Sequence, residues 1–136
     1  MARRWLFKTE PSEYSFADLE RDQKTVWDGI SNSLALKNLR EVRLGDEVII
    51  YHTGEEKAIV GLAVAISDAY PDPRDHSGKL TVVDLKPKRR SPRIVTLAEV
   101  KARPELRDFE LARLPRLSVM PVNNEQWHLI REMSGL

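Results

Sequence analysis

The side chains best suited to acid–base chemistry belong to Glu10, Asp28 and His52. A carboxylate and an imidazole held within hydrogen-bond reach can act as general acid and general base. No spacing ties these three residues together, and they match no catalytic motif. Each also has an ordinary structural explanation, because the carboxylates can accept backbone N–H groups in loops and His52 can close a strand. We therefore predict that the protein is not an enzyme.

Metal and phosphate chemistry have no motif in this sequence. The three histidines, His52, His76 and His128, lie far apart, and the chain contains no cysteine. A thiolate zinc site is therefore excluded. The chain also lacks a glycine-rich phosphate loop and a Gly-x-Ser-x-Gly nucleophile motif. We expect no metal ion and no cofactor.

Aromatic residues are better placed for function than the titratable ones. Trp27 and Tyr51 each precede a polar residue at the end of an extended run. This position suits a ligand-facing ring as well as it suits a packed one. Trp5, Phe7 and Trp127 belong to apolar runs or to a helical stripe, which is typical of core residues.

A central hairpin is the element that must position these rings. Two apolar runs, Val48–Tyr51 and Ile59–Ile66, flank a polar turn at Thr53–Lys57. The first run is apolar at consecutive positions, so both of its faces should be covered. The second alternates large and small side chains, and a small face lets a helix or a ligand approach the backbone. The rings expected at the functional site near these strand ends belong to Tyr51, His52 and Tyr70.

Capping patterns predict the helices. A Ser, Thr or Asn followed three residues later by an acid or an amide marks a helix start. This pattern occurs at Ser15, Thr96 and Asn123. Ser31 or Asn32 can cap a further helix, whose apolar spacing extends to about Val42.

Short apolar runs predict the remaining strands. They lie at Trp5–Phe7, Thr25–Trp27, Leu80–Leu85 and Leu117–Val122. Pro87 follows the third of these runs, and proline cannot donate to a sheet ladder. We therefore expect that strand to pair only at an edge or an end.

The composition is that of an ordinary globular protein. Apolar residues form 41% of the 136 residues and charged residues 32%, with a net charge of +1. We expect a single α+β domain over residues 1–136, in which about five to six mostly antiparallel strands form a small barrel with short helices around it. The N-terminal residues lack the apolar core of a signal peptide, and no run approaches membrane-spanning length. We therefore expect a cytoplasmic, monomeric protein without membrane contact.

One basic cluster stands out against this nearly neutral background. It contains Lys86, Lys88, Arg89, Arg90 and Arg93. Such a cluster can contact nucleic-acid phosphates. Charged residues on an edge strand also prevent edge-to-edge aggregation, so the cluster has a structural explanation as well. The low net charge argues against a long surface that coats a duplex.

Several short motifs follow one another in an order that resembles the EVE domain family of the PUA-like superfamily. They are Trp5–Pro11, Trp27–Gly29, Gly45–Asp46, Tyr51–His52, Ala69–Asp72 and Arg116–Pro121. The resemblance implies a PUA-like pseudo-barrel. It also implies a non-enzymatic nucleic-acid-binding domain that reads a modified nucleobase, of the methylated-cytosine type or another, in DNA or RNA. A flipped or single-stranded base would enter a pocket, stack on rings and be read along its edge.

The resemblance also implies which residues bind. The expected ligand-binding set is Lys8, Thr9, Glu10, Trp27, Asp28, Asn32, Tyr51, His52, Tyr70, Asp72, Ser118 and Val119. The expected contacts to the nucleic-acid backbone are Lys88, Arg89, Arg90 and Arg93.

One segment departs from the family pattern. Where family members typically have Arg, Asn, Tyr, Gln, Ala and Arg, this chain has Ser31–Leu36, which keeps the Asn and the Ala. An arginine can hold a phosphate and a tyrosine can stack, but serine and leucine do neither. A small-molecule or free-nucleotide binder, or an enzyme using the same pocket, is therefore an alternative. A protein-interaction module is a further one, and a large exposed apolar patch would favour it.

Overall fold

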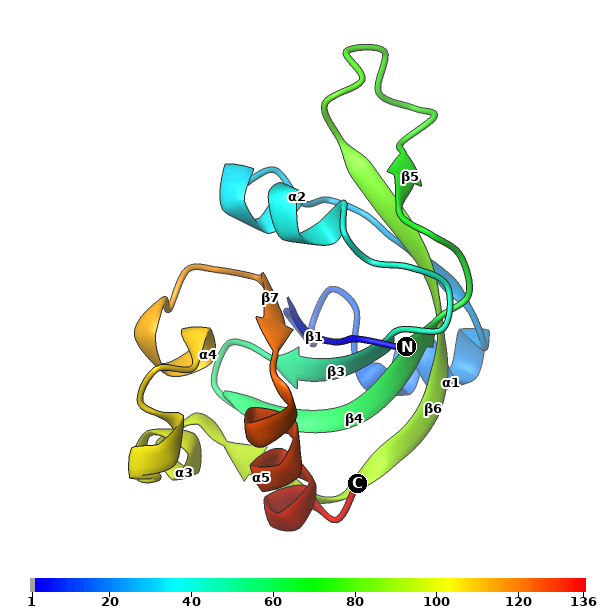
Figure 1. Ribbon diagram of the computed structural model, residues 1–136. Coiled ribbons are helices and arrows are strands. Elements are labelled where there is room, and N and C mark those ends of the chain that lie inside the picture. Colours follow the sequence, from blue (N-terminus) through cyan, green and yellow to red (C-terminus); the bar gives the residue numbers. More distant parts are fainter. Residues whose placement is uncertain (1) are drawn as a thin grey trace.

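A strongly curled sheet with short helices around it forms the protein in a computed structural model that describes residues 2–136 (Figure 1). The strands are β1 (Arg4–Thr9), β2 (Thr25–Trp27), β3 (Glu47–His52), β4 (Ala58–Ala65), β5 (Tyr70–Pro71), β6 (Thr81–Thr96) and β7 (Val119–Val122). The helices are α1 (Phe16–Asp22), α2 (Ser33–Leu39), α3 (Leu97–Lys101), the 3-10 helix η1 (Pro104–Leu106), α4 (Glu110–Arg113) and α5 (Asn124–Ser134).

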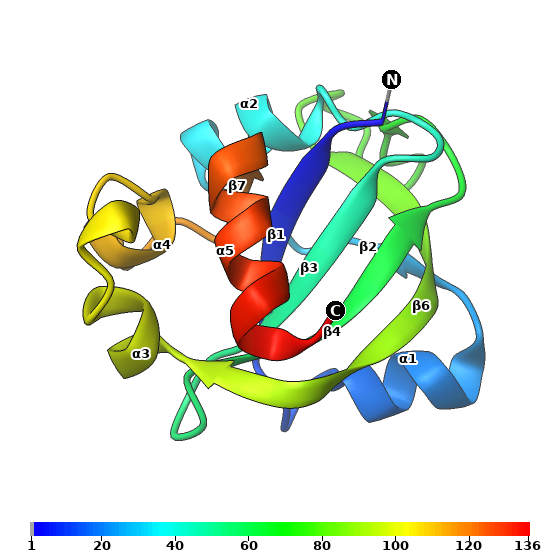
Figure 2. The same ribbon diagram turned by 60° about the horizontal axis from the view of Figure 1, so that its bottom comes forward.

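The sheet curls into a half-barrel. Its strand order is β2-β6-β4-β3-β1-β7, and β5 pairs with β6 outside this path. Within residues 2–136, β1 and β3 are the one parallel pair, and the other pairs are antiparallel. Figure 2 shows β6 bending around the sheet and α5 lying across it. The predicted α+β, mostly antiparallel PUA-like architecture is confirmed.

The central hairpin formed by β3 and β4 is the core of the molecule. Val48, Ile49 and Ile50 are almost completely buried, as consecutive apolar positions predicted. The small face of β4 receives a helix and not a ligand. A Cβ added to Gly61 would lie 2.5 Å from the ring of Phe16, the first residue of α1. The glycine therefore lets α1 pack directly on the strand backbone.

The predicted helix starts are confirmed. Ser15, Thr96 and Asn123 are N-caps, each within a complete capping box. Asn32 caps α2 by accepting the backbone N–H of Ala35 at 3.0 Å. The residues of α2 end at Leu39, before the predicted end at Val42. None of these helices among residues 2–136 is long and apolar enough to cross a membrane.

The strand does not end at Pro87, but Pro87 lies at a local edge as expected, because the pairing of β6 with β2 stops at Leu85 and, among the described strands, Pro87 pairs with β4 alone. β6 continues through Pro87 to Thr96, and it lies between β2 and β4 in the sheet. Pro87 lies opposite Ala63, where the ladder between β4 and β6 shifts register after Leu62. Because the regular hydrogen bonding is interrupted at such an irregularity, a residue without an N–H is tolerated there.

Candidate ligand pocket

A pocket of about 540 Å³ lies at the open side of the half-barrel. One wall is β2, which is the strand at one end of the sheet, and Ser118 precedes β7 at the other end. The end of β1 and the loop after it complete the pocket. The lining residues are Lys8, Thr9, Glu10, Glu13, Tyr14, Thr25, Val26, Trp27, Asp28, Gly29, Ile30 and Ser118.

Two rings form the aromatic part of the wall. Trp27 is only 7% exposed and packs against Phe7, with ring centroids 5.7 Å apart. Tyr14 meets Trp27 edge to face at 6.2 Å. Its hydroxyl donates to Asp22 at 3.0 Å, which fixes the ring direction. Burial raises the pKa of Tyr14, so the phenol stays neutral at physiological pH.

Tyr14 was not among the predicted site residues. It lies one residue before the N-cap Ser15, in a loop with no apolar periodicity. A ring at this position has only one sequence signal, which is that the residue before an N-cap often packs against its own helix. That signal points to packing, so sequence reasoning had no reason to place the ring in a pocket.

Lys8 supplies a positive charge to the pocket. Its ammonium donates to the carbonyl of Pro115 at 2.9 Å and lies 5.6 Å from the centre of the Tyr51 ring. Burial lowers the pKa of Lys8 from its ordinary value. The Lys8 backbone N–H donates to the carbonyl of Ser118 at 2.9 Å, which joins the β1 end to the segment before β7.

Carboxylates supply the hydrogen-bond acceptors of the pocket. Glu10 accepts the backbone N–H of Ser12 at 3.2 Å and its hydroxyl at 3.0 Å, and it accepts the hydroxyl of Thr53 at 3.2 Å. The Ser12 N–H contributes most to holding the pKa of Glu10 below its ordinary value. Asp28 accepts from Arg74 at 2.6 Å, and Glu13 is the third acid. With one lysine against three acids, this wall favours a ligand that carries N–H donors.

Tyr51 and His52 do not line the pocket. Tyr51 is 3% exposed and lies in the core beneath Lys8. His52 Nε2 accepts the backbone N–H of Phe16 at 3.0 Å, while Nδ1 contacts the carboxylate of Glu56. His52 therefore holds the first turn of α1 on the sheet. The pocket lies at the neighbouring end of β1 and not at the hairpin ends where the site was expected.

Four other expected ligand residues also lie outside the pocket lining. Tyr70 donates its hydroxyl to Asp84 at 2.6 Å, and this bond raises the pKa of Tyr70 to about 12. Asp72 accepts from Arg74, and the side-chain hydrogen bond from Arg74 lowers its pKa. Asn32 is occupied in capping α2, and Val119 is completely buried. The structure therefore brings together Lys8, Thr9, Glu10, Trp27, Asp28 and Ser118 from the expected set.

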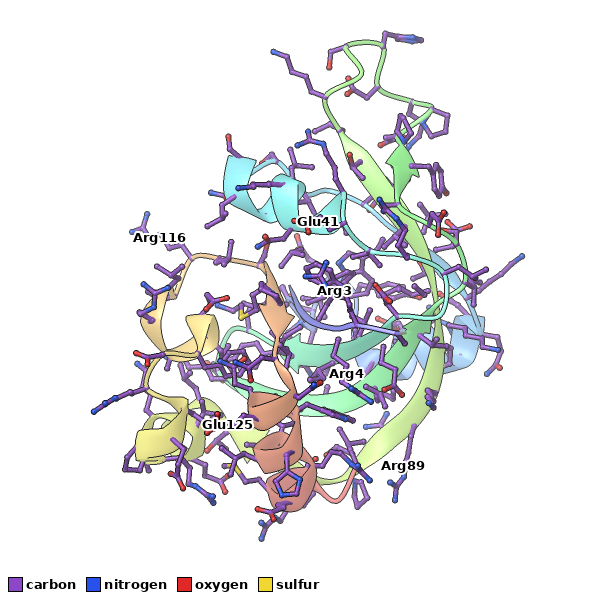
Figure 3. All side chains as sticks on the ribbon, viewed as in Figure 1. Arg3, Arg4, Glu41, Arg89, Arg116 and Glu125 are labelled. Atoms are coloured by element: carbon purple, nitrogen blue, oxygen red, sulfur yellow. The ribbon has the colours of Figure 1, made fainter. Side chains whose placement is uncertain are left out.

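The basic cluster makes contacts within the protein. Lys88 pairs with Glu47, Arg90 pairs with Glu20, and Arg89 and Arg93 donate to the carbonyls of Gly135 and Met133. A second hollow, of about 570 Å³, contains Arg3 and Arg4, which are paired with Glu41 and Glu47. Figure 3 labels Arg3, Arg4 and Glu41. Within residues 2–136, no group of three or more His, Cys, Asp or Glu side chains is arranged to hold a metal ion.

Together, the half-open curled sheet and the pocket at its unpaired ends define a small PUA-like domain. The family model described as "EVE domain" matches residues 3–133. The chain therefore belongs to the EVE domain family.

Relatives with solved structures share the whole fold. The protein Rpa0253 of Rhodopseudomonas palustris is 42% identical, with a TM-score of 0.93 over 98% of this chain and 94% of that one. Human thymocyte nuclear protein 1 is 28% identical over 164 residues, covering 96% of this chain and 73% of the human protein. A crystal structure of the human protein in complex with 5-methylcytosine-containing DNA has a TM-score of 0.90 over 99% of both chains.

Proposed function

We propose that this protein is a nucleic-acid-binding domain that holds a modified nucleobase, of the methylated-cytosine type, in the pocket beside β2. The main observation behind this proposal is that the pocket lining combines the rings of Tyr14 and Trp27 with carboxylate acceptors. The complex of the human relative with 5-methylcytosine-containing DNA supports the choice of ligand.

The dimensions and chemistry of the pocket suit a base. Its volume of about 540 Å³ lies within the range of small-molecule sites. Base–aromatic stacking contributes about 1–3 kcal/mol per base. Carboxylates accept hydrogen bonds from exocyclic amino groups such as that of cytosine. Glu13 can supply such an acceptor, whereas Glu10 is already held by Ser12 and Asp28 is paired with Arg74.

Phosphates would approach from the side of Lys8 and Arg116. Lys8 lines the pocket, and its ammonium is bound to the turn that carries Arg116. Arg116 is exposed and makes no ion pair or hydrogen bond with any other residue of the described chain. Figure 3 shows it on the loop before β7, well separated from Arg89 on β6. A free guanidinium suits phosphate binding better than the internally paired basic cluster does.

A free nucleobase or nucleoside is the second candidate ligand. The observation that favours it is the pair of acids Glu10 and Glu13 in the pocket, because they would repel the phosphates of a polynucleotide, whereas Asp28 is paired with Arg74. The uncharged segment Ser31–Leu36 adds no compensating cation.

The decisive test is a binding panel at fixed salt. It compares single- and double-stranded oligonucleotides, with one cytosine or one 5-methylcytosine each, and the corresponding free nucleosides. We expect the modified oligonucleotide to bind more tightly than its unmodified match and than the nucleoside. Equal affinity for modified and unmodified strands would contradict base reading. Nucleosides that bind as tightly as oligonucleotides would establish the second candidate.

A further inference from the structure

The outer edge of β2 is an unpaired sheet edge that borders the pocket. β2 is the last strand in the sheet order, and among the strands that the structure describes it pairs with β6 alone. The pocket lining contains every residue from Thr25 to Ile30, so it follows this strand along its length. Val26 is the middle residue of the strand, and its side chain is 47% exposed.

The backbone of Val26 points toward this free edge. Val26 lies opposite Asp84 of β6. The Asp84 carbonyl accepts the N–H of Ile66 at 2.8 Å, and the Asp84 N–H donates to the Ser67 hydroxyl at 3.0 Å. Both polar backbone groups of Asp84 are therefore turned away from β2. Opposed residues in an antiparallel ladder exchange both hydrogen bonds or neither. Consequently, the N–H and the C=O of Val26 are directed away from β6.

We propose that the backbone of Val26 reads the edge of the bound heterocycle, an inference that rests on the proposed function. Its N–H donates to a ring nitrogen or carbonyl oxygen, and its C=O accepts an N–H from the base. The N–H and the C=O of Val26 would form the same pair of hydrogen bonds with the base that a strand residue forms with a residue of a neighbouring strand. The ligand class is a planar heterocycle that carries a donor beside an acceptor on one edge, as every nucleobase does.

Burial makes this readout selective. Without ligand, water can satisfy both backbone groups at the exposed edge. A bound ring that excludes this water must replace both hydrogen bonds, because unsatisfied buried groups are strongly disfavoured. An occupant with an apolar edge is therefore rejected. The side chain of Val26 takes no part, so the identity of the residue matters less than its N–H.

A proline substitution separates the N–H from the side chain. Val26→Pro removes the donor, and Val26→Ala trims the side chain while keeping the donor. Because this N–H makes no ladder bond, proline is compatible with the edge position, and Thr25 before it is already extended. Val26→Ala, which keeps the N–H, provides the reference affinity for the modified oligonucleotide. We expect Val26→Pro to bind about tenfold or more weakly.

Amide exchange measured by NMR on the unsubstituted protein is a second test of whether the Val26 backbone binds the base. It replaces the first test if thermal unfolding shows that Val26→Pro is misfolded. On addition of the modified oligonucleotide, the Val26 amide should shift and exchange more slowly with solvent. An unchanged Val26 amide, or a folded Val26→Pro variant that binds as well as Val26→Ala, would contradict base recognition by the Val26 backbone. Either result would leave the proposed function intact. Absence of any binding by the unsubstituted protein would refute the proposed function, and with it base recognition by the Val26 backbone.

Discussion

The two pocket rings have different roles because they differ in what lies behind them. Trp27 packs against Phe7 and is almost buried, so it supports the core as well as the pocket. Truncating a buried Trp to Ala typically costs about 3–5 kcal/mol of stability. Tyr14 is only partly buried and is held at its hydroxyl by Asp22. Tyr14 is therefore the better residue for separating ligand stacking from folding.

Substituting Tyr14 should reveal stacking directly. We expect Tyr14→Leu to weaken binding of the modified oligonucleotide by about tenfold, because it removes one stacking surface. Tyr14→Phe keeps the ring and loses only the bond to Asp22, so its affinity should stay within about threefold. Fluorescence titration measures both, and thermal unfolding checks the fold. Equal losses in the two variants would show that the hydroxyl, not the ring face, matters.

Sequence motifs predicted the β1 end of the site better than its other parts. Lys8 to Glu10 lie in one continuous segment, so finding one of them locates the others. Tyr51 and His52 were expected at the site because strand ends often carry ligand residues. Their side chains instead hold Lys8 and the start of α1. This difference depends on which way the curled sheet turns its faces, and a linear pattern does not contain that information.

At the scale of elements, local signals fixed the helix starts, whereas tertiary contacts fixed the strand limits. Each capping box involves residues only three positions apart, so the sequence contains it entirely. The length of β6 depends on a register shift in its pairing with β4, which lies elsewhere in the chain. The sequence of β4 likewise predicted a face of small side chains but not whether a helix or a ligand covers it, because the covering residues lie elsewhere in the chain.

Gly61 is the position where this packing is most sensitive. Gly61→Ala should lower the free energy of unfolding by about 1–3 kcal/mol, because its Cβ would meet the Phe16 ring at 2.5 Å. Denaturant titration measures the change. In a Phe16→Leu background the smaller side chain leaves room, so the added cost of Gly61→Ala should fall. Strictly additive effects would show that α1 does not press on this strand.

The segment around α2 offers a gain-of-function test. Ser31 is exposed and adjoins Ile30 in the pocket lining, whereas Leu36 is 6% exposed and belongs to the core. Arginine can therefore be introduced at the first position but not at the second. Ser31→Arg should tighten oligonucleotide binding and steepen its salt dependence by about 0.7–0.9 in the log–log slope. Ser31→Gln is the uncharged control, and a slope like that of Ser31→Gln would contradict a phosphate contact here.

For the whole molecule, charge placement matters more than the total charge of +1. The cluster at Lys88–Arg93 is the densest basic run, yet its four named cations contact carboxylates or carbonyls of the protein. Arg116 lies outside this run, is exposed, and precedes the pocket residue Ser118 by two positions. The number of basic residues close together in the sequence therefore does not predict how many cations on the folded surface are available to bind a polyanion.

Salt dependence distinguishes these two surfaces. We expect Arg116→Ala to reduce the log–log slope of oligonucleotide binding by about 0.7–0.9, because one phosphate contact is lost. Arg89→Ala should leave the slope unchanged, since its guanidinium is bound to the carbonyl of Gly135. The opposite result would assign the phosphate contacts to the basic cluster on β6.

The attachment of β2 has a consequence for ligand size. Among the described strands, β2 pairs with β6 alone, and Trp27 also packs against Phe7 of β1, so the position of Trp27 relative to Lys8 depends on the course of β6 and on this ring contact. The course of β6 includes the irregular pairing near Pro87, which lies outside the pocket lining. Residues outside the pocket lining, such as Phe7, therefore help to set the thickness of the ligand that the pocket can admit.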